Sequence, residues 1–133
     1  MQIHESAEDY LETILMLEER GKPVRSIDIV NEMNYSKPSV SIAMKKLRES
    51  GYISMSSAGQ IRLLPAGRQI AEEIWARHRL LTDILTAVGV EEKAAQKQAC
   101  RIEHDIDSGT YQKLYDYYAA HMKPEQEKHT KQQ

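Results

Sequence analysis

A helical spacing of apolar residues runs along most of this chain and is interrupted once, between Gly51 and Pro65. This interruption limits the folds that the chain can adopt. On either side, apolar residues recur every three or four positions, as they do on amphipathic helices. In between, two short apolar runs at 52–55 and 61–64 flank a loop that contains two serines and a glycine, which predicts a two-stranded hairpin. The expected fold class is therefore mainly α, with one small hairpin.

Two helices joined by a tight turn are expected just before the hairpin. The first, at residues 26–33, is expected to be capped by Ser26, and Asn34-Tyr35 forms the turn. The second opens with Ser36 as its N-cap and Pro38 in its first turn, where a missing backbone N–H costs nothing. Two such helices followed by a hairpin predict a winged helix-turn-helix, whose second helix enters the major groove of DNA.

Helices are also expected on both sides of this module. One starts after Ser6, and a long one runs from about residue 68 to 88. Shorter helices are expected at 91–107 and 110–122. Residues 123–133 lack an apolar anchor, so we expect a disordered tail there.

Composition excludes several classes of protein. The 133 residues, 41% of them hydrophobic, suit one globular domain or two small helical ones. There is no run of about 18 to 20 apolar residues, and the N-terminus is charged where a signal peptide needs an apolar block, so we expect a cytoplasmic protein without a membrane partner. The single cysteine cannot form an internal disulfide, which leaves it free to act as a buried thiol or a metal ligand.

Charge is distributed unevenly along the chain. The net charge is −2, yet residues 22–68 hold eight basic and three acidic side chains, a net charge of +5. A local basic patch favours binding to DNA phosphates, because counterion release depends on the charge of the patch and not on the net charge of the whole chain. Alternatively, these charges could form an ordinary solvated surface. The residues expected to face DNA are Arg25, Ser36, Lys37, Pro38, Ser39, Ser41, Lys45, Lys46 and Arg62. Ser36 and Ser39 could instead only cap their helix.

Three residues near the C-terminus suggest a metal site. Cys100, Glu103 and His104 stand at i, i+3 and i+4, so on a helix their thiol, carboxylate and imidazole lie on one face. Each has a structural alternative: a cysteine is often a small buried hydrophobe, for example.

Three further candidate ligands lie elsewhere in the sequence. Asp9 and Glu12 stand at i and i+3 near the N-terminus, and His78 lies within the long helix. The acids could instead favour the helix dipole, and His78 could be an interior histidine bonded to backbone. If all six residues are ligands, Asp9, Cys100, Glu103 and His104 could surround one ion, while Glu12, His78 and a bridging Glu103 hold a second.

The ligand types narrow the choice of metal. Carboxylates and water favour Mn(II) or Fe(II), whereas a thiolate shifts the balance toward Fe(II), Co(II) or Zn(II). We therefore expect Mn(II) or Fe(II), with one or two ions per subunit, and binding of Co(II) or Zn(II) in vitro.

Five segments of this chain together resemble a known family. They are EDYLETI, KPSVSIAMKKLRESGYI, LLPAGRQIA, ARHRLL and ACRIEH, which are similar to segments of the diphtheria-toxin-repressor-like metalloregulators, a family that includes manganese-dependent and iron-dependent repressors. The likeness extends from residue 7 to about residue 118. It implies an N-terminal DNA-binding domain, following helices that form a dimer interface, and a divalent metal that acts as corepressor.

The resemblance also implies a ligand set and a domain organisation. Asp9, Glu12, His78, Glu103 and His104 match positions of the manganese branch, whereas Cys100 matches the iron branch. The expected form is short, without the SH3-like domain of the longer iron-branch members. The expected domains are a winged helix-turn-helix at 1–67, a helical metal-binding and dimerisation domain at 68–122, and the tail.

The expected function is a metal-dependent DNA-binding repressor that controls metal homeostasis and acts as a homodimer on palindromic double-stranded DNA. One alternative is a winged-helix regulator that responds to a small molecule, a partner protein or Zn(II). A metalloenzyme is disfavoured, because the sequence shows no general base beyond the ligands and no glycine-rich phosphate loop.

Overall fold

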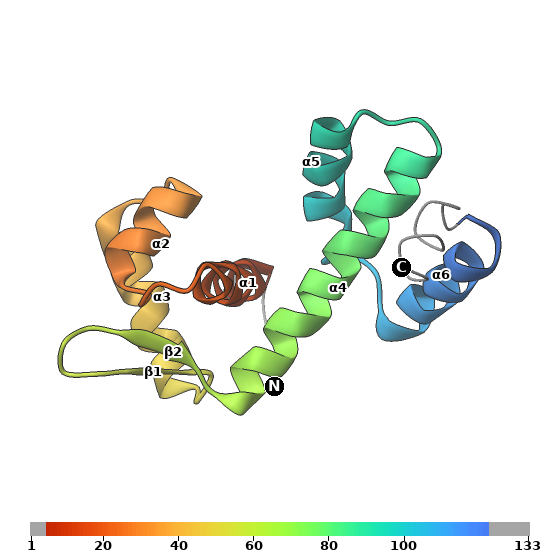
Figure 1. Ribbon diagram of the computed structural model, residues 1–133. Helices are drawn as coiled ribbons and strands as arrows, with labels where there is room; N and C mark the ends of the chain where they lie inside the picture. The colour runs from red at the N-terminus through yellow and green to blue at the C-terminus, as the bar shows by residue number, and fades with distance from the viewer. Residues whose placement is uncertain (1–4, 123–133) are drawn as a thin grey trace. The chain divides into compact units, whose positions relative to one another are not determined.

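The computed structural model describes residues 5–122, which form helices and one two-stranded sheet (Figure 1). The elements are α1 (Glu5–Glu19), α2 (Ser26–Met33), α3 (Lys37–Glu49), β1 (Ile53–Met55), β2 (Ile61–Leu63), α4 (Pro65–Ala87), α5 (Glu92–Ile102) and α6 (Ser108–His121). The predicted fold class, mainly α with one hairpin, is confirmed. The tail expected at 123–133 lies outside the described residues. Among the described helices, none is both long and apolar enough to cross a lipid bilayer.

The chain divides into two compact units, Met1–Trp75 and Ala76–Gln133, and the division falls within α4. The first unit therefore contains α1, α2, α3, the hairpin and the beginning of α4. The second contains the rest of α4 with α5 and α6. The domain boundary expected at residues 67 and 68 stays a prediction.

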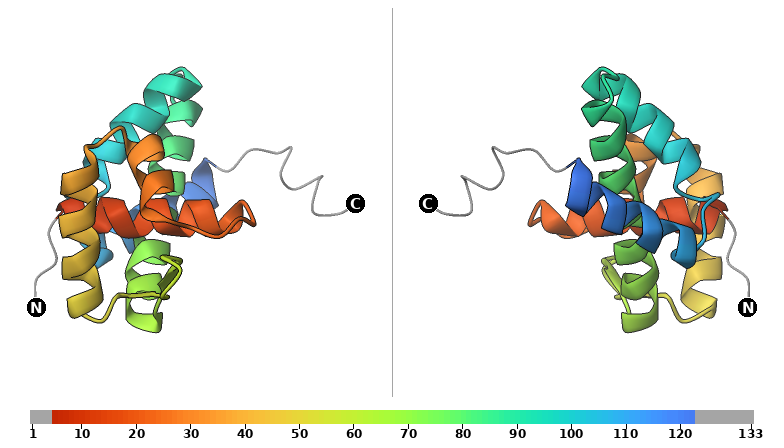
Figure 2. Two further views of the ribbon diagram at one scale, coloured as in Figure 1. Left: turned by 90° about the vertical axis from the view of Figure 1, so that its left-hand side faces the viewer. Right: turned by 90° about the vertical axis from the view of Figure 1, so that its right-hand side faces the viewer.

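The first unit has its core around α1, which contacts α2, α3 and β2 (Figure 2). Apolar side chains from all of these elements are enclosed because each helix presents one apolar face inward. The side chains that are no more than 1% exposed include Leu11, Ile14, Ile29, Val40, Met44, Ile53 and Ile61. The core thus joins the helix-turn-helix and the hairpin into one body.

The turn between α2 and α3 follows from its sequence. Asn34 ends α2 with a φ of 58°, a left-handed conformation that asparagine tolerates better than most residues. Ser36 caps α3 as predicted, because its Oγ accepts a hydrogen bond from the Ser39 N–H at 3.2 Å. The cap of α2 differs from the prediction: Arg25 and not Ser26 takes this position, and the Arg25 N–H donates to Asp28 Oδ2 at 2.9 Å.

The hairpin is antiparallel, with Ser54 opposite Arg62. A single backbone bridge adds Val24 on the far side of β2, where the Ile61 N–H donates to the Val24 carbonyl at 2.7 Å. The hairpin is the predicted wing, and the segment before α2 supports it.

The start of α4 lies earlier than the sequence predicted. The sequence predicts this helix from about residue 68, but α4 begins at Pro65, because proline is favoured at the first helical position. Gly67 is required for a tertiary reason: a Cβ there would overlap the backbone carbonyl of Tyr52. The hairpin and α4 therefore pack against each other at this glycine.

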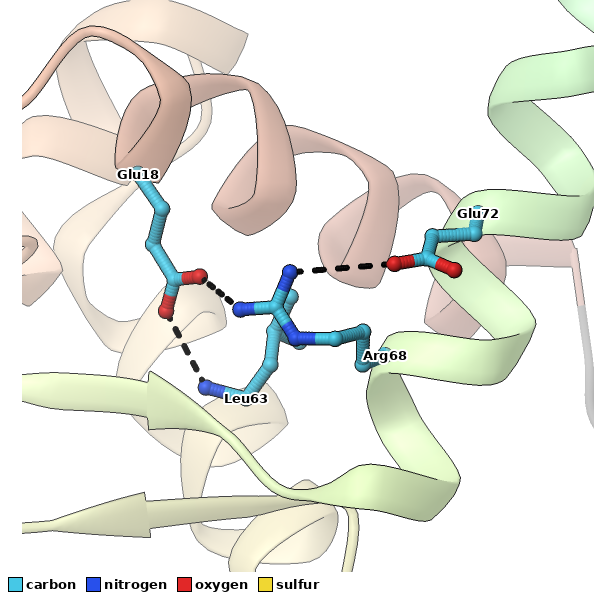
Figure 3. A network of polar contacts seen from close by, with 4 residues as sticks. All are labelled: Glu18, Leu63, Arg68 and Glu72. Atoms are coloured by element: carbon cyan, nitrogen blue, oxygen red, sulfur yellow. Dashed lines mark hydrogen bonds and ion pairs between the residues drawn. The ribbon is translucent and has the colours of Figure 1, made fainter.

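A polar network holds the exit of the hairpin (Figure 3). One oxygen of the Glu18 carboxylate, on α1, accepts from the Leu63 N–H at 3.2 Å, and the other accepts from the Arg68 guanidinium at 2.6 Å. Glu72 lies 3.8 Å from Arg68 and is 60% exposed. Glu18 thus connects α1, β2 and α4, whereas Glu72 contributes little.

The second unit has a sparse core. Up to residue 122, its buried apolar residues are Leu80, Leu81, Ala95, Ala99 and Tyr118. Figures 1 and 2 show α5 beside the second half of α4. The helix predicted at 91–107 is shorter, since α5 ends at Ile102 and Asp107 caps α6, accepting from the Thr110 N–H at 2.7 Å.

Candidate metal centre and DNA interface

One face of α3 is exposed and basic, as predicted for a DNA-reading helix. Its inward face consists of Val40, Met44 and Leu47, which are buried, and Ala43, which is partly buried. The outward side chains at the predicted DNA-facing positions on or next to α3, all of them exposed, are Ser36, Lys37, Pro38, Ser39, Ser41, Lys45 and Lys46. Such a surface offers cations to phosphates and short hydroxyls to base edges.

Two predicted DNA-facing residues lie off this helix. Arg62 is exposed on β2. Arg25 is exposed before α2, and its guanidinium donates to the backbone carbonyl of Ala58 in the wing loop at 2.6 Å. Ser36 acts as a helix cap, which supports the structural reading of this residue that the sequence left open.

In the second unit, His78, Cys100 and Glu103 come together. Each offers one ligand atom, and these atoms all lie within 4.8 Å of one another. His78 comes from α4, Cys100 from the last turn of α5, and Glu103 follows α5 directly as its C-cap. The end of α5 therefore places a thiol and a carboxylate opposite one imidazole.

The imidazole of His78 is held by both partners. Its Nδ1 lies 2.9 Å from Glu103 Oε2, and its side chain is 16% exposed. Hydrogen bonds to Cys100 first and then to Glu103 raise the pKa of His78 to about 10, although burial acts in the opposite direction. In the metal-free protein His78 is therefore protonated at neutral pH.

Glu103 is the only charged residue between positions 5 and 122 that is buried, with none of its surface exposed. Its Oε1 makes no hydrogen bond within the described chain, and His104 Nε2 lies 3.5 Å from it. The side chain of His104 is 2% exposed. A buried carboxylate oxygen that accepts no hydrogen bond is costly, and a cation would satisfy it. The donor set therefore fits a divalent metal ion.

Asp9 and Glu12 lie on α1, in the first unit, and both are partly exposed. Their one-turn spacing places them on the same face of that helix, as predicted. Their role as metal ligands stays a prediction.

Two features of these sites were not predicted. The two-ion arrangement that the sequence allowed separates His78 from Cys100, whereas the structure places them in one cluster with Glu103. The bond from Arg25 to the wing loop joins residues 33 positions apart, and no local pattern indicates it.

Two family models match the chain. Residues 2–59 match the N-terminal DNA-binding domain of the iron-dependent repressors. Residues 64–133 match the metal-binding and dimerisation domain of the same repressors.

Curated relatives agree with these matches. An HTH-type transcriptional regulator of Methanocaldococcus jannaschii is 30% identical over 83% of this chain and 90% of its own length. The diphtheria toxin repressor of Corynebacterium diphtheriae is 29% identical over 83% of this chain, which spans about half (49%) of that protein. The transcriptional regulator MntR of Salmonella typhimurium is 29% identical over 80% of this chain and 68% of its own length.

Solved structures show the same fold. The manganese regulator SloR has a TM-score of 0.76 and 24% identity over 90% of this chain and 55% of that chain. A manganese-dependent transcriptional repressor in complex with manganese has a TM-score of 0.75 and 25% identity over 81% of this chain and 50% of that chain.

Proposed function

Because this chain belongs to the iron-dependent repressor family, we propose that it is a cytoplasmic DNA-binding repressor controlling metal homeostasis, with Mn(II) or Fe(II) as its corepressor. One observation supports this best. The carboxylate of Glu103 is buried beside His78 and Cys100, and one of its oxygens has no hydrogen-bond partner. Such a buried carboxylate costs folding free energy, and a bound metal ion would offset that cost.

His78, Cys100 and Glu103 would hold the ion from within the second unit. We propose Asp9, Glu12 and His104 as further ligands on the sequence resemblance. A divalent cation supplies positive charge that offsets the acidic side chains, and one or two ions per subunit are compatible with this number of donors. Mixed carboxylate, imidazole and thiolate donors suit Fe(II) and Mn(II), and also Co(II) or Zn(II) in vitro.

The protein residues prepare the site in defined ways. His78 must release its proton before a ring nitrogen can offer its lone pair, so metal and proton compete for this residue. Glu103 fixes the ring orientation through the 2.9 Å contact to Nδ1. Burial keeps water away from Glu103 and strengthens its electrostatic interactions.

On the DNA side, the cations of α3 and β2 would contact phosphates, and Ser39 and Ser41 would contact base edges. A two-fold homodimer would present two α3 helices to a palindromic operator, about 34 Å or a multiple apart. A coupling free energy of about 1 to 3 kcal/mol between metal and DNA would make repression depend on metal.

The test is DNA binding with and without metal. A duplex is selected from a randomised pool by the Co(II)-treated protein, and its affinity is then measured by fluorescence anisotropy without metal and with Mn(II), Fe(II), Co(II) or Zn(II) under anaerobic conditions. We expect metal to strengthen binding by at least about fivefold. Glu103→Gln should abolish this gain, whereas Glu92→Gln, at an exposed acid on α5, should retain it. Equal affinity of the wild type under all conditions would contradict the proposal and favour a regulator of another ligand.

Cys100 is the residue that should set metal preference. Cys100→Glu replaces a thiolate by a carboxylate, which should improve the response to Mn(II) relative to Zn(II) in the same assay. An unchanged ranking of the ions would remove Cys100 from the selectivity argument.

A further inference from the structure

The outward face of α3 contains one large apolar side chain. Ile42 is 57% exposed, more than Ile27 on α2 and more than Tyr35 in the turn. Its neighbours on this face are Ser39, one turn before it, and Lys45, one turn after it, and both are exposed. Ile42 therefore lies in the middle of the surface that the proposed function turns toward DNA.

Folding does not account for Ile42. The inward face of α3 is complete with Val40, Met44 and Leu47, which are all at most 5% exposed. An exposed β-branched residue inside a helix is also slightly unfavourable, because its rotamers are restricted against the preceding turn. At this position a polar residue or alanine would serve the helix better.

The chemistry of the surrounding face limits what Ile42 can contact. The lysines on α3 attract a polyanion, which favours DNA over another apolar protein surface as the partner of this face. In the major groove, the exposed apolar group on a base edge is the C5-methyl of thymine, and the other base edges present hydrogen-bonding atoms. Isoleucine has no donor or acceptor, so facing those atoms it would desolvate them without compensation.

We propose that Ile42 contacts the C5-methyl group of a thymine in each half-site of the operator and makes that thymine a determinant of specificity, an inference that rests on the proposed DNA-binding function. The neighbouring lysines position the helix on the phosphates and Ser39 and Ser41 contact other base edges, while Ile42 distinguishes thymine from cytosine at one position.

The experiment removes only the methyl group. In the duplex selected by the wild-type protein, each thymine is replaced in turn by 2′-deoxyuridine, which keeps the same hydrogen-bonding atoms. Affinity is measured by anisotropy for the wild type, for Ile42→Ala, and for Ile27→Ala as the matched control on α2. Ile42 is 57% exposed and Ile27 is 45% exposed, so both variants should fold, and circular dichroism verifies this.

At one thymine per half-site, we expect deoxyuridine to weaken wild-type binding by about fourfold, the effect of burying one methyl-sized apolar group. Ile42→Ala should bind both duplexes equally, and Ile27→Ala should behave like the wild type. The dependence on salt should be the same for wild type and Ile42→Ala, because no phosphate contact is lost.

The inference is wrong if no thymine methyl matters to the wild type, or if Ile42→Ala loses as much affinity as the wild type on deoxyuridine substitution. Either result leaves the proposed function intact as long as the wild type binds the selected duplex. Failure of the wild type to select or bind any duplex would instead overturn the proposed function.

Discussion

The pH dependence of metal binding follows from the environment of His78. Its pKa is raised to about 10 by hydrogen bonds to Cys100 and Glu103. Below that pH the imidazole carries an extra proton, which an incoming ion must displace. Because the pKa of His78 in the folded protein is raised, protons compete with the metal ion for this residue throughout the neutral range. This competition disappears only as the pH rises through about 10. Metal affinity should therefore increase with pH.

The magnitude follows from one displaced proton. Each unit of pH should change the association constant about tenfold, which corresponds to about 1.4 kcal/mol. Between pH 6 and pH 8 the contribution of His78 alone should reach about a hundredfold. Anaerobic Co(II) titrations followed by absorbance measure the affinity, and calorimetry in two buffers of different ionisation enthalpy counts the protons released.

The control variant isolates the His78 proton from protons that other ligands release. His78→Gln keeps a polar side chain at the position but has no titrating ring. It should bind Co(II) more weakly, and its plot of log affinity against pH should have a slope smaller by one. Identical slopes for the variant and the wild type would refute the assignment of this proton to His78.

Two further predictions concern the first unit, each with a matched control, and urea denaturation measures both. Glu18→Ala should lower the free energy of unfolding by about 1 to 3 kcal/mol, because the Leu63 N–H of β2 loses its acceptor. Its control, Glu72→Ala, should lower it by less than about 0.5 kcal/mol, since the ion pair of Glu72 is long and exposed. Equal losses for the two variants would contradict the role given to Glu18 in the network. Gly67→Ala should destabilise the protein by about 1 to 3 kcal/mol, because its Cβ would overlap a backbone carbonyl. Its control, Gly109→Ala at the start of α6, would place a Cβ at an ordinary contact distance of 3.6 Å from Asp107 Oδ1, so it should stabilise by about 0.4 to 1 kcal/mol. A stabilising effect of Gly67→Ala would contradict this prediction, because it would show that the Tyr52 carbonyl can move away from the added Cβ.

Local signals in the sequence predicted much of the first unit. Ser36 and Pro38 placed the start of α3, and the change of apolar spacing placed the hairpin. These features depend on residues a few positions apart, so the sequence contains all the information that they need.

Features that depend on packing were not predictable in this way. Pro65 and Gly67 are typical of a turn, and only the approach of the Tyr52 carbonyl explains a glycine inside α4. Similarly, the apolar pattern did not show that α5 ends at Ile102, although Asp107 is a common type of N-cap residue and could have indicated a new helix.

The candidate metal centre was predictable in its residue types but not in its grouping. Spacing alone predicted Cys100 and Glu103 on one helix face, and in the structure their ligand atoms lie close together at the end of α5. That both of them face His78 depends on how α5 packs beside α4, and local spacing in a sequence does not reveal such long-range packing.

The Glu103 oxygen that accepts no hydrogen bond has a consequence for the lifetime of the molecule. In the metal-free protein the cost of this buried atom falls on the segment that follows α5, so residues 103–107 should open locally more often than the helices around them. Opened segments are the sites where cellular proteases cut. Scarcity of the ion would then reduce the amount of the protein as well as the fraction of it that has metal bound. Amide hydrogen exchange of residues 103–107, measured with and without Co(II), would reveal the difference in local opening.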